Sequence, residues 1–306
     1  ILPSKAIVDP QFAHEIQMIV EQNRIDILIP VDSKQISDWL KLKEKLLKTL
    51  DYYSNFETFD KLNNKLLFAK MCTELSIPSP RSFSPHEVDN ISKRCKYVFK
   101  PTKSASSKGV KYFRDLKNLK EYCKNYGSRD FVVQEYFVGM GAGISFYAHK
   151  GEIKDYYLHR RILEYPVSGG SSTMRGGFDS PHRQRIIKDA KKLVKYLNWS
   201  GFCMLELKYN EKEYTFIEAN PRIWGSIKQG LVNGVNYFSF MFGKVGHTKP
   251  LKERITYQTP LVFLSLIGYI LKGDIKMVLR FIQVFSSEPD INFFNDPKGY
   301  LGQFFV

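Results

Sequence analysis

The densest chemistry in the sequence lies in two strand-like segments near its middle. Residues 202–208 read FCMLELK and residues 214–220 read YTFIEAN. If they pair as a hairpin with the turn centred midway between them, Glu206 lies directly opposite Glu218. Asn220 then falls on the same side of the sheet, because the side chains of a strand alternate with a period of two. The pattern therefore predicts two carboxylates and one amide on a single face.

Two carboxylates that face each other on one side of a sheet repel unless a cation lies between them. Oxygen ligands such as Glu206, Glu218 and Asn220 suit Mg²⁺ that is held together with substrate phosphates. The hairpin therefore predicts a magnesium nucleotide site, with Met204 and Phe216 on the same face. The alternative is a hairpin whose acidic side chains are solvated on its outer face.

A second feature is a lysine at the end of a hydrophobic strand, followed by a loop of small residues. Lys100 lies in YVFKP, and residues 102–110 read TKSASSKGV. The backbone N–H groups of such a loop can close on phosphate oxygens, although the segment is not a Walker A sequence. The alternative is a serine-rich loop without a ligand beside a solvated lysine.

A pair of arginines precedes a glycine-rich segment. Arg160 and Arg161 end a predicted strand, and Gly169 and Gly170 begin a loop that continues with the hydroxyl residues 171–173. Adjacent residues of a strand point to opposite faces, so one arginine at most reaches the site. We favour Arg161, and we interpret the loop as a substrate loop. A Gly-Ser turn without a ligand is the alternative.

Helices and short strands surround these segments and would position them. Apolar residues at helical spacing predict helices, and short apolar runs beside turn residues predict strands. The order favours an α/β start followed by α+β lobes. The predicted helices cover residues 11–22, 33–50, 61–75, 115–126 and 181–197. The predicted strands cover residues 25–31, 96–100, 131–136, 144–150, 153–159, 202–208 and 214–219.

Taken in order, these segments resemble the ATP-grasp superfamily, and most closely the carboxylate-amine ligases of its carbamoyl-phosphate-synthase-like branch. The resemblance covers about residues 60–230 and depends on the order of six pieces. These are Asn64-Lys65, VFKP with its loop, VVQEYFVGMGAGIS, HRR with PVSGGSST, MLELK, and IEANPRIWGS.

The resemblance implies that the chain is divided into four parts. Residues 1–60 would be a partial α/β domain whose upstream strands are missing. An ATP-grasp fold of two lobes that clasp ATP would follow, with the phosphate lid in a small lobe at 61–135 and the metal hairpin in a large lobe at 136–250. Residues 251–306 would form a C-terminal helical extension.

The resemblance also implies how ATP is held. Two lysines would contact the phosphates, the loop at 102–110 would form the lid, and the hinge between the lobes would offer its backbone to adenine. The implied nucleotide-binding residues are Lys65, Lys100, Ser106, Gly109, Gln134, Glu135, Tyr136, Phe137 and Met204.

For the metal, the resemblance implies Mg²⁺ or Mn²⁺, as two ions, on Glu206, Glu218 and Asn220. For catalysis it implies Arg222 and Arg161, together with Lys100. A planar guanidinium such as that of Arg222 suits a phosphoryl group or a carboxylate, because it donates two parallel hydrogen bonds.

The implied reaction is the activation of a carboxylate as an acyl phosphate, which an amine then captures. ADP and phosphate are the by-products, and no side-chain nucleophile is required. His159, beside the arginines, is the one histidine that we select for testing. A nearer alternative keeps the fold but transfers phosphate to a hydroxyl group.

The composition bears on the partners. The 306 residues include 46 Lys and Arg against 31 Asp and Glu, a formal net charge of +15 that favours anionic partners. With 18 Tyr and 23 Phe, a nucleic-acid or anionic-polymer binding protein is the alternative from another class. The basic residues are spread along the chain, however. We therefore expect a small acidic carboxylate and an amine as substrates, and no nucleic acid.

Four cysteines without a CxxC pair favour a reduced, cytoplasmic protein. Residues 256–271 are uncharged but contain Pro260 and Gly268 and are shorter than the roughly 20 residues of a transmembrane helix. We interpret the apolar C-terminal runs as core or dimer-interface helices. Because Lys252, Lys272, Lys276 and Arg280 accompany them, contact with an anionic membrane surface is the alternative.

Overall fold

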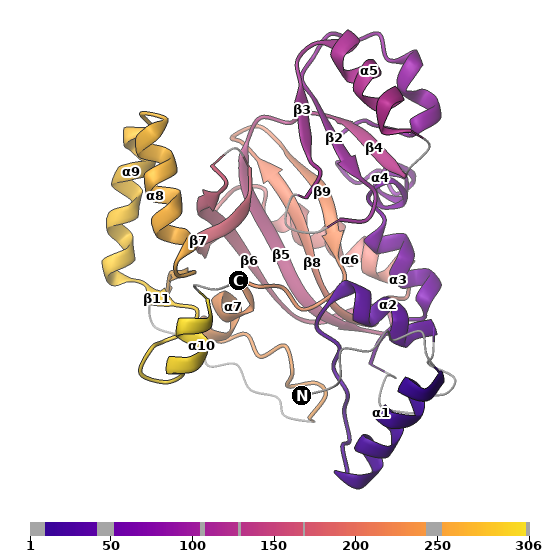
Figure 1. Cartoon of the computed structure of the whole chain (residues 1–306), viewed down its shortest axis with the longest axis vertical. Coiled ribbons are helices and arrows are strands. Elements are labelled where there is room, and N and C mark those ends of the chain that lie inside the picture. The colour runs from indigo at the N-terminus through magenta and orange to yellow at the C-terminus, as the bar shows by residue number, and fades with distance from the viewer. Residues whose placement is uncertain are drawn as a thin grey trace.

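The computed structural model of the chain describes residues 10–41, 52–104, 108–127, 130–167, 169–242 and 253–303. Two β-sheets organise it, one of four strands and one of seven, and each has its own apolar core. In Figure 1 the small sheet stands above the large one, and helices flank both.

The small sheet is antiparallel, with the strand order β1-β4-β2-β3. Phe99 and Phe131 pack beneath helix α5 (Leu116–Tyr126) in its core. This helix was predicted over residues 115–126, and Asp115 caps its start by accepting a hydrogen bond from the Asn118 N–H. The strands and the 3₁₀ helix of this part are β1 (Ser82–Phe83), η2 (Pro85–Asn90), β2 (Tyr97–Pro101), β3 (Lys111–Phe113) and β4 (Phe131–Glu135).

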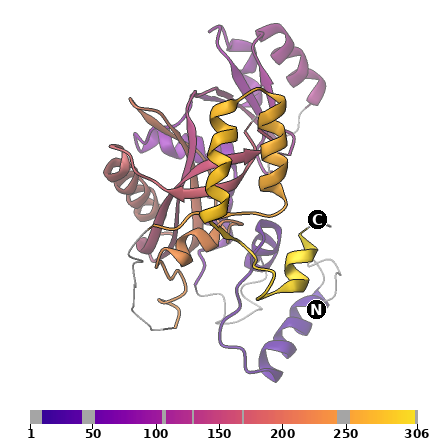
Figure 2. The same cartoon turned by 90° about the vertical axis from the view of Figure 1, so that its left-hand side faces the viewer.

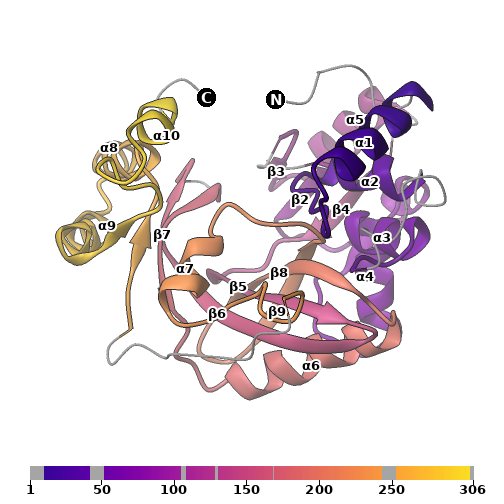
Figure 3. The same ribbon diagram turned by 90° about the horizontal axis from the view of Figure 1, so that it is seen from below.

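The large sheet has the order β11-β10-β7-β6-β5-β8-β9. Helix α6 (Arg183–Tyr196) covers its lower face in Figure 3 through buried residues such as Ile186 and Leu193, which leaves the other face for the site. The strands are β5 (Met140–His149), β6 (Glu152–Tyr165), β7 (Ser171–Gly177), β8 (Gly201–Tyr209), β9 (Tyr214–Asn220), β10 (Thr256–Tyr257) and β11 (Glu288–Pro289).

The β8–β9 hairpin has the predicted register at its acidic end. Glu206 pairs with Glu218, and Met204 pairs with Asn220. A bulge after Glu206 then shifts the register, so Phe216 lies opposite Leu207. The prediction that Phe216 shares the acidic face is therefore wrong, and its side chain is buried in the core of the large sheet.

The helix predicted over residues 61–75 is two helices, α3 (Phe56–Asn63) and α4 (Lys65–Glu74). Asn64 separates them because its backbone is extended and its side chain accepts hydrogen bonds from the Leu66 and Leu67 N–H groups. Both helices pack against β9. The break places Lys65 in the first turn of α4, beside the acidic hairpin.

The N-terminal part contains α1 (Pro10–Gln22) and α2 (Ser33–Lys41), as predicted for its described residues. The predicted strand at 25–31 is wrong. No described strand lies beside this segment to pair with it, so its apolar residues pack half-buried against the core of the large sheet instead. The rest of the helix predicted to residue 50 lies outside the described residues.

The C-terminal part packs on the large sheet next to β6 and β7. Ile162 and Met174 of the sheet meet Val262, Tyr269 and Val284 in a third apolar cluster. No helix within the described ranges is long and apolar enough to cross a membrane. The remaining helices are α7 (Ile227–Val232), α8 (Leu261–Leu271), α9 (Ile275–Arg280), η3 (Phe281–Ser286) and α10 (Pro297–Gly302).

Candidate active site

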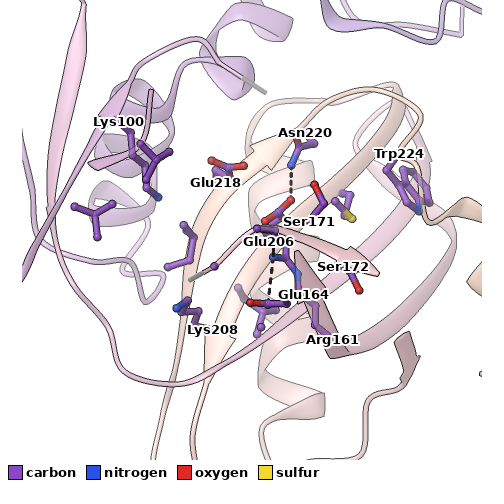
Figure 4. A pocket seen from close by; sticks show the side chains of 18 of the residues that line it. Lys100, Arg161, Glu164, Ser171, Ser172, Glu206, Lys208, Glu218, Asn220 and Trp224 are labelled. Atoms are coloured by element: carbon purple, nitrogen blue, oxygen red, sulfur yellow. Dashed lines mark hydrogen bonds and ion pairs between the residues drawn. The ribbon is translucent and has the colours of Figure 1, made fainter. Parts of the chain in front are cut away.

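A cavity of about 530 Å³ lies between the small sheet and the open face of the large sheet. Residues of β2 and β4 line one side, and the β8–β9 hairpin lines the other (Figure 4). The connection between β6 and β7 and the first residues after β9 close one end. The cavity therefore joins segments from across residues 65–261 into one site.

The predicted metal ligands meet on the floor of this cavity. Glu206 and Glu218 occupy adjacent strands, and the Asn220 amide donates a hydrogen bond to the Glu206 carboxylate at 3.1 Å. Each carboxylate also has a cation of the chain nearby. The guanidinium of Arg161 contacts Glu206, and the Lys65 Nζ lies 3.6 Å from Glu218 Oε2. The repulsion expected between the two acids is thus compensated.

Both predicted phosphate-binding lysines are buried and line the cavity. Lys65 is fixed by the Ser104 carbonyl, which accepts from its Nζ at 2.8 Å, and by the Thr102 carbonyl, which accepts from its backbone N–H. Burial lowers the pKa of Lys100 to about 8, and the positive charge of Lys65 adds to this effect, although Glu218 opposes it. Lys100 is thus a desolvated cation that would gain from a phosphate partner.

The predicted lid is described only in part. Ser106 lies outside the described residues. Gly109 has a φ of +76°, and a Cβ there would come within 2.8 Å of the Pro101 side chain, so this position requires glycine. Val110 lines the cavity and Gly109 does not.

The predicted hinge lies along one wall of the cavity, where Gln134, Glu135, Tyr136 and Phe137 line it. The Glu135 N–H is donated to the Arg81 carbonyl, so only its carbonyl remains for a contact with adenine. The Tyr136 ring lies under the Lys208 ammonium, 4.9 Å from it. Met204, which was predicted to lie beside the nucleotide, also lines the cavity.

The structure distinguishes the two arginines of β6. Arg161 lines the cavity, whereas Arg160 is exposed. Burial disfavours the charge of Arg161, but Glu206 and Glu164 outweigh this effect and raise its pKa. Gly141 makes room for it, since a Cβ there would meet the Arg161 Cδ at 2.6 Å.

Arg222 also lines the cavity. It follows Asn220, the last of the predicted metal ligands, by two residues. Its guanidinium donates to the Asn220 Oδ1 at 3.1 Å and to the Ile223 carbonyl at 3.0 Å. These two bonds fix the orientation of a group that can hold an anion above the hairpin.

Comparison with known proteins identifies the family. A family model described as "ATP-grasp domain" matches residues 62–226, more than half of the chain. The chain belongs to the ATP-grasp family. The predictions of this fold and of this family are confirmed.

Several solved structures share the ATP-grasp fold of this chain. An L-amino acid ligase from Bacillus licheniformis has a TM-score of 0.55 and 18% identity, over 72% of this chain and 54% of that one. A biotin carboxylase from Campylobacter jejuni has a TM-score of 0.65 and 12% identity, over 82% and 63%. An N5-carboxyaminoimidazole ribonucleotide synthetase from Thermus thermophilus has a TM-score of 0.64 and 14% identity, over 81% and 69%.

This ATP-grasp chain thus spans about half the length of the L-amino acid ligase and less than two thirds of the length of the biotin carboxylase. No curated protein is similar to it in sequence. Identities this low show that the fold is shared but do not show which reaction the chain catalyses.

One histidine belongs to this ATP-grasp site. His159 is buried and lines the cavity. Burial lowers its pKa to about 3, and the charges of Arg161 and Arg175 add to this effect. The imidazole is therefore neutral near pH 7. A Cβ at Gly143 would come within 2.7 Å of its Cε1, so glycine is needed beneath it.

Sequence reasoning missed several residues of the cavity. Lys208 could have been found, because it follows Glu206 by two positions on the same strand and so shares its face. Arg175 is fully buried and forms an ion pair with Asp290 of the C-terminal part, a contact that no local pattern indicates. Other missed residues include Tyr112, Glu164, Trp224, Gln258 and Leu261.

Proposed function

We propose that this ATP-grasp protein is an ATP- and Mg²⁺-dependent ligase that joins a carboxylate to an amine. In the first step a carboxylate oxygen attacks the γ-phosphorus of ATP, the bond from this phosphorus to the β,γ-bridging oxygen breaks, and ADP leaves. In the second step the amine attacks the acyl carbon of the acyl phosphate. Phosphate leaves, the nitrogen loses a proton, and an amide remains.

One observation carries this proposal: two opposed carboxylates and an amide form the floor of a cavity lined by lysines and arginines. Within the described ranges no three His, Cys, Asp or Glu side chains cluster as metal ligands, and the third ligand of this site is an amide. Glu206, Glu218 and Asn220 fit Mg²⁺, because all three offer oxygen and both acids already lie beside a cation. We infer that these three residues hold two ions.

Bound there, Mg²⁺ would offset the negative charge of the triphosphate during phosphoryl transfer. The side chains of the chain supply the rest. Lys65, Lys100 and Arg222 line the cavity. The lysines would contact the phosphates, and Arg222 would contact the transferred group or the attacking carboxylate. His159 is neutral and is not needed as a nucleophile.

The charge of the cavity supports an acidic substrate. Six cationic and four acidic side chains line it, an excess of two positive charges in the described residues. Divalent ions add to this excess, and ATP contributes about four negative charges when it is fully ionised. A carboxylate substrate would therefore enter a site that tolerates further negative charge.

The reaction is tested with the whole chain, ATP, Mg²⁺ and a set of small carboxylates, with hydroxylamine in place of the amine. An acyl phosphate would give a hydroxamate together with ADP. ADP production without any hydroxamate would favour phosphate transfer to a hydroxyl group and contradict ligation. Glu218→Gln, which removes one charge at equal volume, is the control and should give neither product.

A further inference from the structure

The C-terminal helices expose an unusual amount of apolar surface. Of the 21 large apolar side chains that are exposed in the described ranges, 12 lie between residues 263 and 301. Nine of them belong to α8, α9 and η3, and we call these nine the apolar face. Its members are Phe263, Leu264, Ile267, Ile270, Leu271, Ile275, Leu279, Ile282 and Phe285.

The apolar face is the outer side of helices whose inner side is already packed. Along α8, Val262, Ser265 and Tyr269 are buried against the large sheet. Phe263 and Ile267, one turn apart, are exposed on the other side. The core of the sheet is therefore complete without the apolar face.

Two adjacent helices contribute to this surface. Ile275, Leu279 and Ile282 recur at helical spacing along α9 and η3. Figure 2 shows α8 and α9 side by side on the side of the molecule that faces the viewer, and the two helices are in contact. Their turn carries Leu271 and Ile275, which are 82% and 71% exposed, so the apolar face extends to the end of the helix pair.

Cations accompany the apolar face. Lys272 and Lys276 are exposed at the turn, and Arg280 is half-buried on α9. The Lys272 Nζ also donates to the Val167 carbonyl at 3.1 Å. Asp274 is the one acid among residues 261–286, and its side chain is engaged with the Met277 N–H at the start of α9.

This charge distinguishes two kinds of partner. In a twofold dimer the same surface patch meets itself. The one acid of this patch, Asp274, is already engaged at the start of α9, so a second copy offers little complementary charge to the cations. A bilayer with anionic lipids offers the complementary charge and an apolar interior for the same side chains.

We propose that the apolar face docks on the surface of an anionic lipid bilayer. The apolar side chains would enter the boundary between headgroups and acyl chains, and the three cations would contact lipid phosphates. Leu261, the first residue of α8, lines the active-site cavity. Docking would therefore hold the site close to the membrane surface.

Co-sedimentation of the whole chain with vesicles tests this proposal without ATP or substrate, so its result is independent of the proposed reaction. We expect binding to vesicles of phosphatidylglycerol and phosphatidylcholine, and little binding to phosphatidylcholine alone. The variant Leu271→Ser/Ile275→Ser/Phe285→Ser should lose about 1,000-fold in affinity, because burial of each of the three side chains contributes roughly tenfold. Val31→Ser/Val138→Ser, exposed apolar positions elsewhere, is the matched control and should bind normally.

Lys272→Gln/Lys276→Gln should weaken binding by roughly 25-fold, since each cation near the surface contributes about fivefold. Circular dichroism checks that every variant is folded. Absence of vesicle binding, or equal binding to neutral and anionic vesicles, would overturn the proposal. So would a native dimer in analytical ultracentrifugation that the triple serine variant converts to a monomer.

Discussion

The two ends of the cavity are built in different ways. The nucleotide end consists of charged side chains on helix α4 and on strands β2, β8 and β9, and its Lys65 and Lys100 are buried. At the other end, which we call the substrate end, Arg175 is accompanied by hydroxyl, amide and aromatic groups. These are Tyr165, Ser171, Ser172, Trp224, Ser226 and Gln258.

The difference indicates a division of tasks. Fixed charges on regular elements suit phosphate chemistry, which is the same for every substrate of such an enzyme. Neutral polar groups at strand ends and on connecting segments suit selection between substrates. Changes at the nucleotide end should therefore lower turnover with any substrate, whereas changes at the substrate end should alter only which substrate is used.

The largest effect is expected at the metal ligands. Glu218→Gln should lower ADP formation by about 10³-fold while leaving the fold intact, because it removes a charge without changing the side-chain volume. Glu213→Gln, an exposed glutamate of the same hairpin, is the matched control and should be fully active. Full activity of Glu218→Gln in an ADP assay would contradict the metal assignment.

A smaller effect is expected for Arg222. Arg222→Ala should lower kcat by about 100-fold and change the KM for ATP much less, because its guanidinium lies beyond the metal ligands. Steady-state kinetics with varied ATP measures both quantities. Arg160→Ala, which alters the exposed arginine of β6, should match the native enzyme. Equal losses in kcat and in affinity for ATP would argue that Arg222 has only a structural role.

Lys100 should give a pH dependence at the nucleotide end. Its pKa of about 8 lies below the ordinary lysine value, so the ammonium is lost as the pH rises through 8. ATP affinity should therefore fall between pH 7 and 9, whereas Lys100→Arg should show little change over this range. Lys100→Ala should weaken ATP binding by roughly 10- to 100-fold at pH 7. An identical pH profile for the native protein and Lys100→Arg would refute the assignment.

The same burial has a consequence for stability. The pKa of Lys100 is lower in the folded chain than in the unfolded chain, so protonation of Lys100 lowers the free energy of unfolding. This loss of stability is complete below pH 8 and disappears as the pH rises toward 10.5. Lys100→Met should therefore raise the melting temperature at pH 7 while lowering ATP affinity. A melting temperature below that of the native protein would contradict this prediction. It would show that attraction to Glu218 fully offsets the cost of burying the Lys100 charge.

The smallest effect is expected at the substrate end. Ser171→Ala should change the KM for a carboxylate or amine substrate by about fivefold, the value of one ordinary hydrogen bond, and leave the KM for ATP unchanged. Ser286→Ala, at an exposed serine of η3, is the control. A change in the KM for ATP alone would place Ser171 at the nucleotide end and contradict the division of the cavity.

The nucleotide end could largely be predicted from sequence because strand periodicity acts locally. The spacing of Glu206, Glu218 and Asn220 on two neighbouring strands was enough to place them on one face. The same rule would have placed Lys208 with them. It failed at Phe216, because a bulge adds one residue to β9 and no residue type in the hairpin signals it.

The substrate end depends on contacts between distant segments. Arg175 pairs with Asp290, and Gln258 donates its backbone N–H to the Thr173 carbonyl across the sheet edge. Nothing in the sequence near Arg175 identifies Asp290. The strand predicted at 25–31 failed for a related reason, since an apolar run becomes a strand only where another strand lies beside it.

Binding of Mn²⁺ tests the central claim most directly, because the opposed carboxylates are the feature on which the proposed reaction depends. Electron paramagnetic resonance with a non-hydrolysable ATP analogue should show bound Mn²⁺ in the native protein. In Glu206→Gln and Glu218→Gln the metal should bind at least about tenfold more weakly, and in Glu213→Gln it should bind normally. Equal Mn²⁺ affinity in all four proteins would contradict the assignment of this hairpin as the metal site.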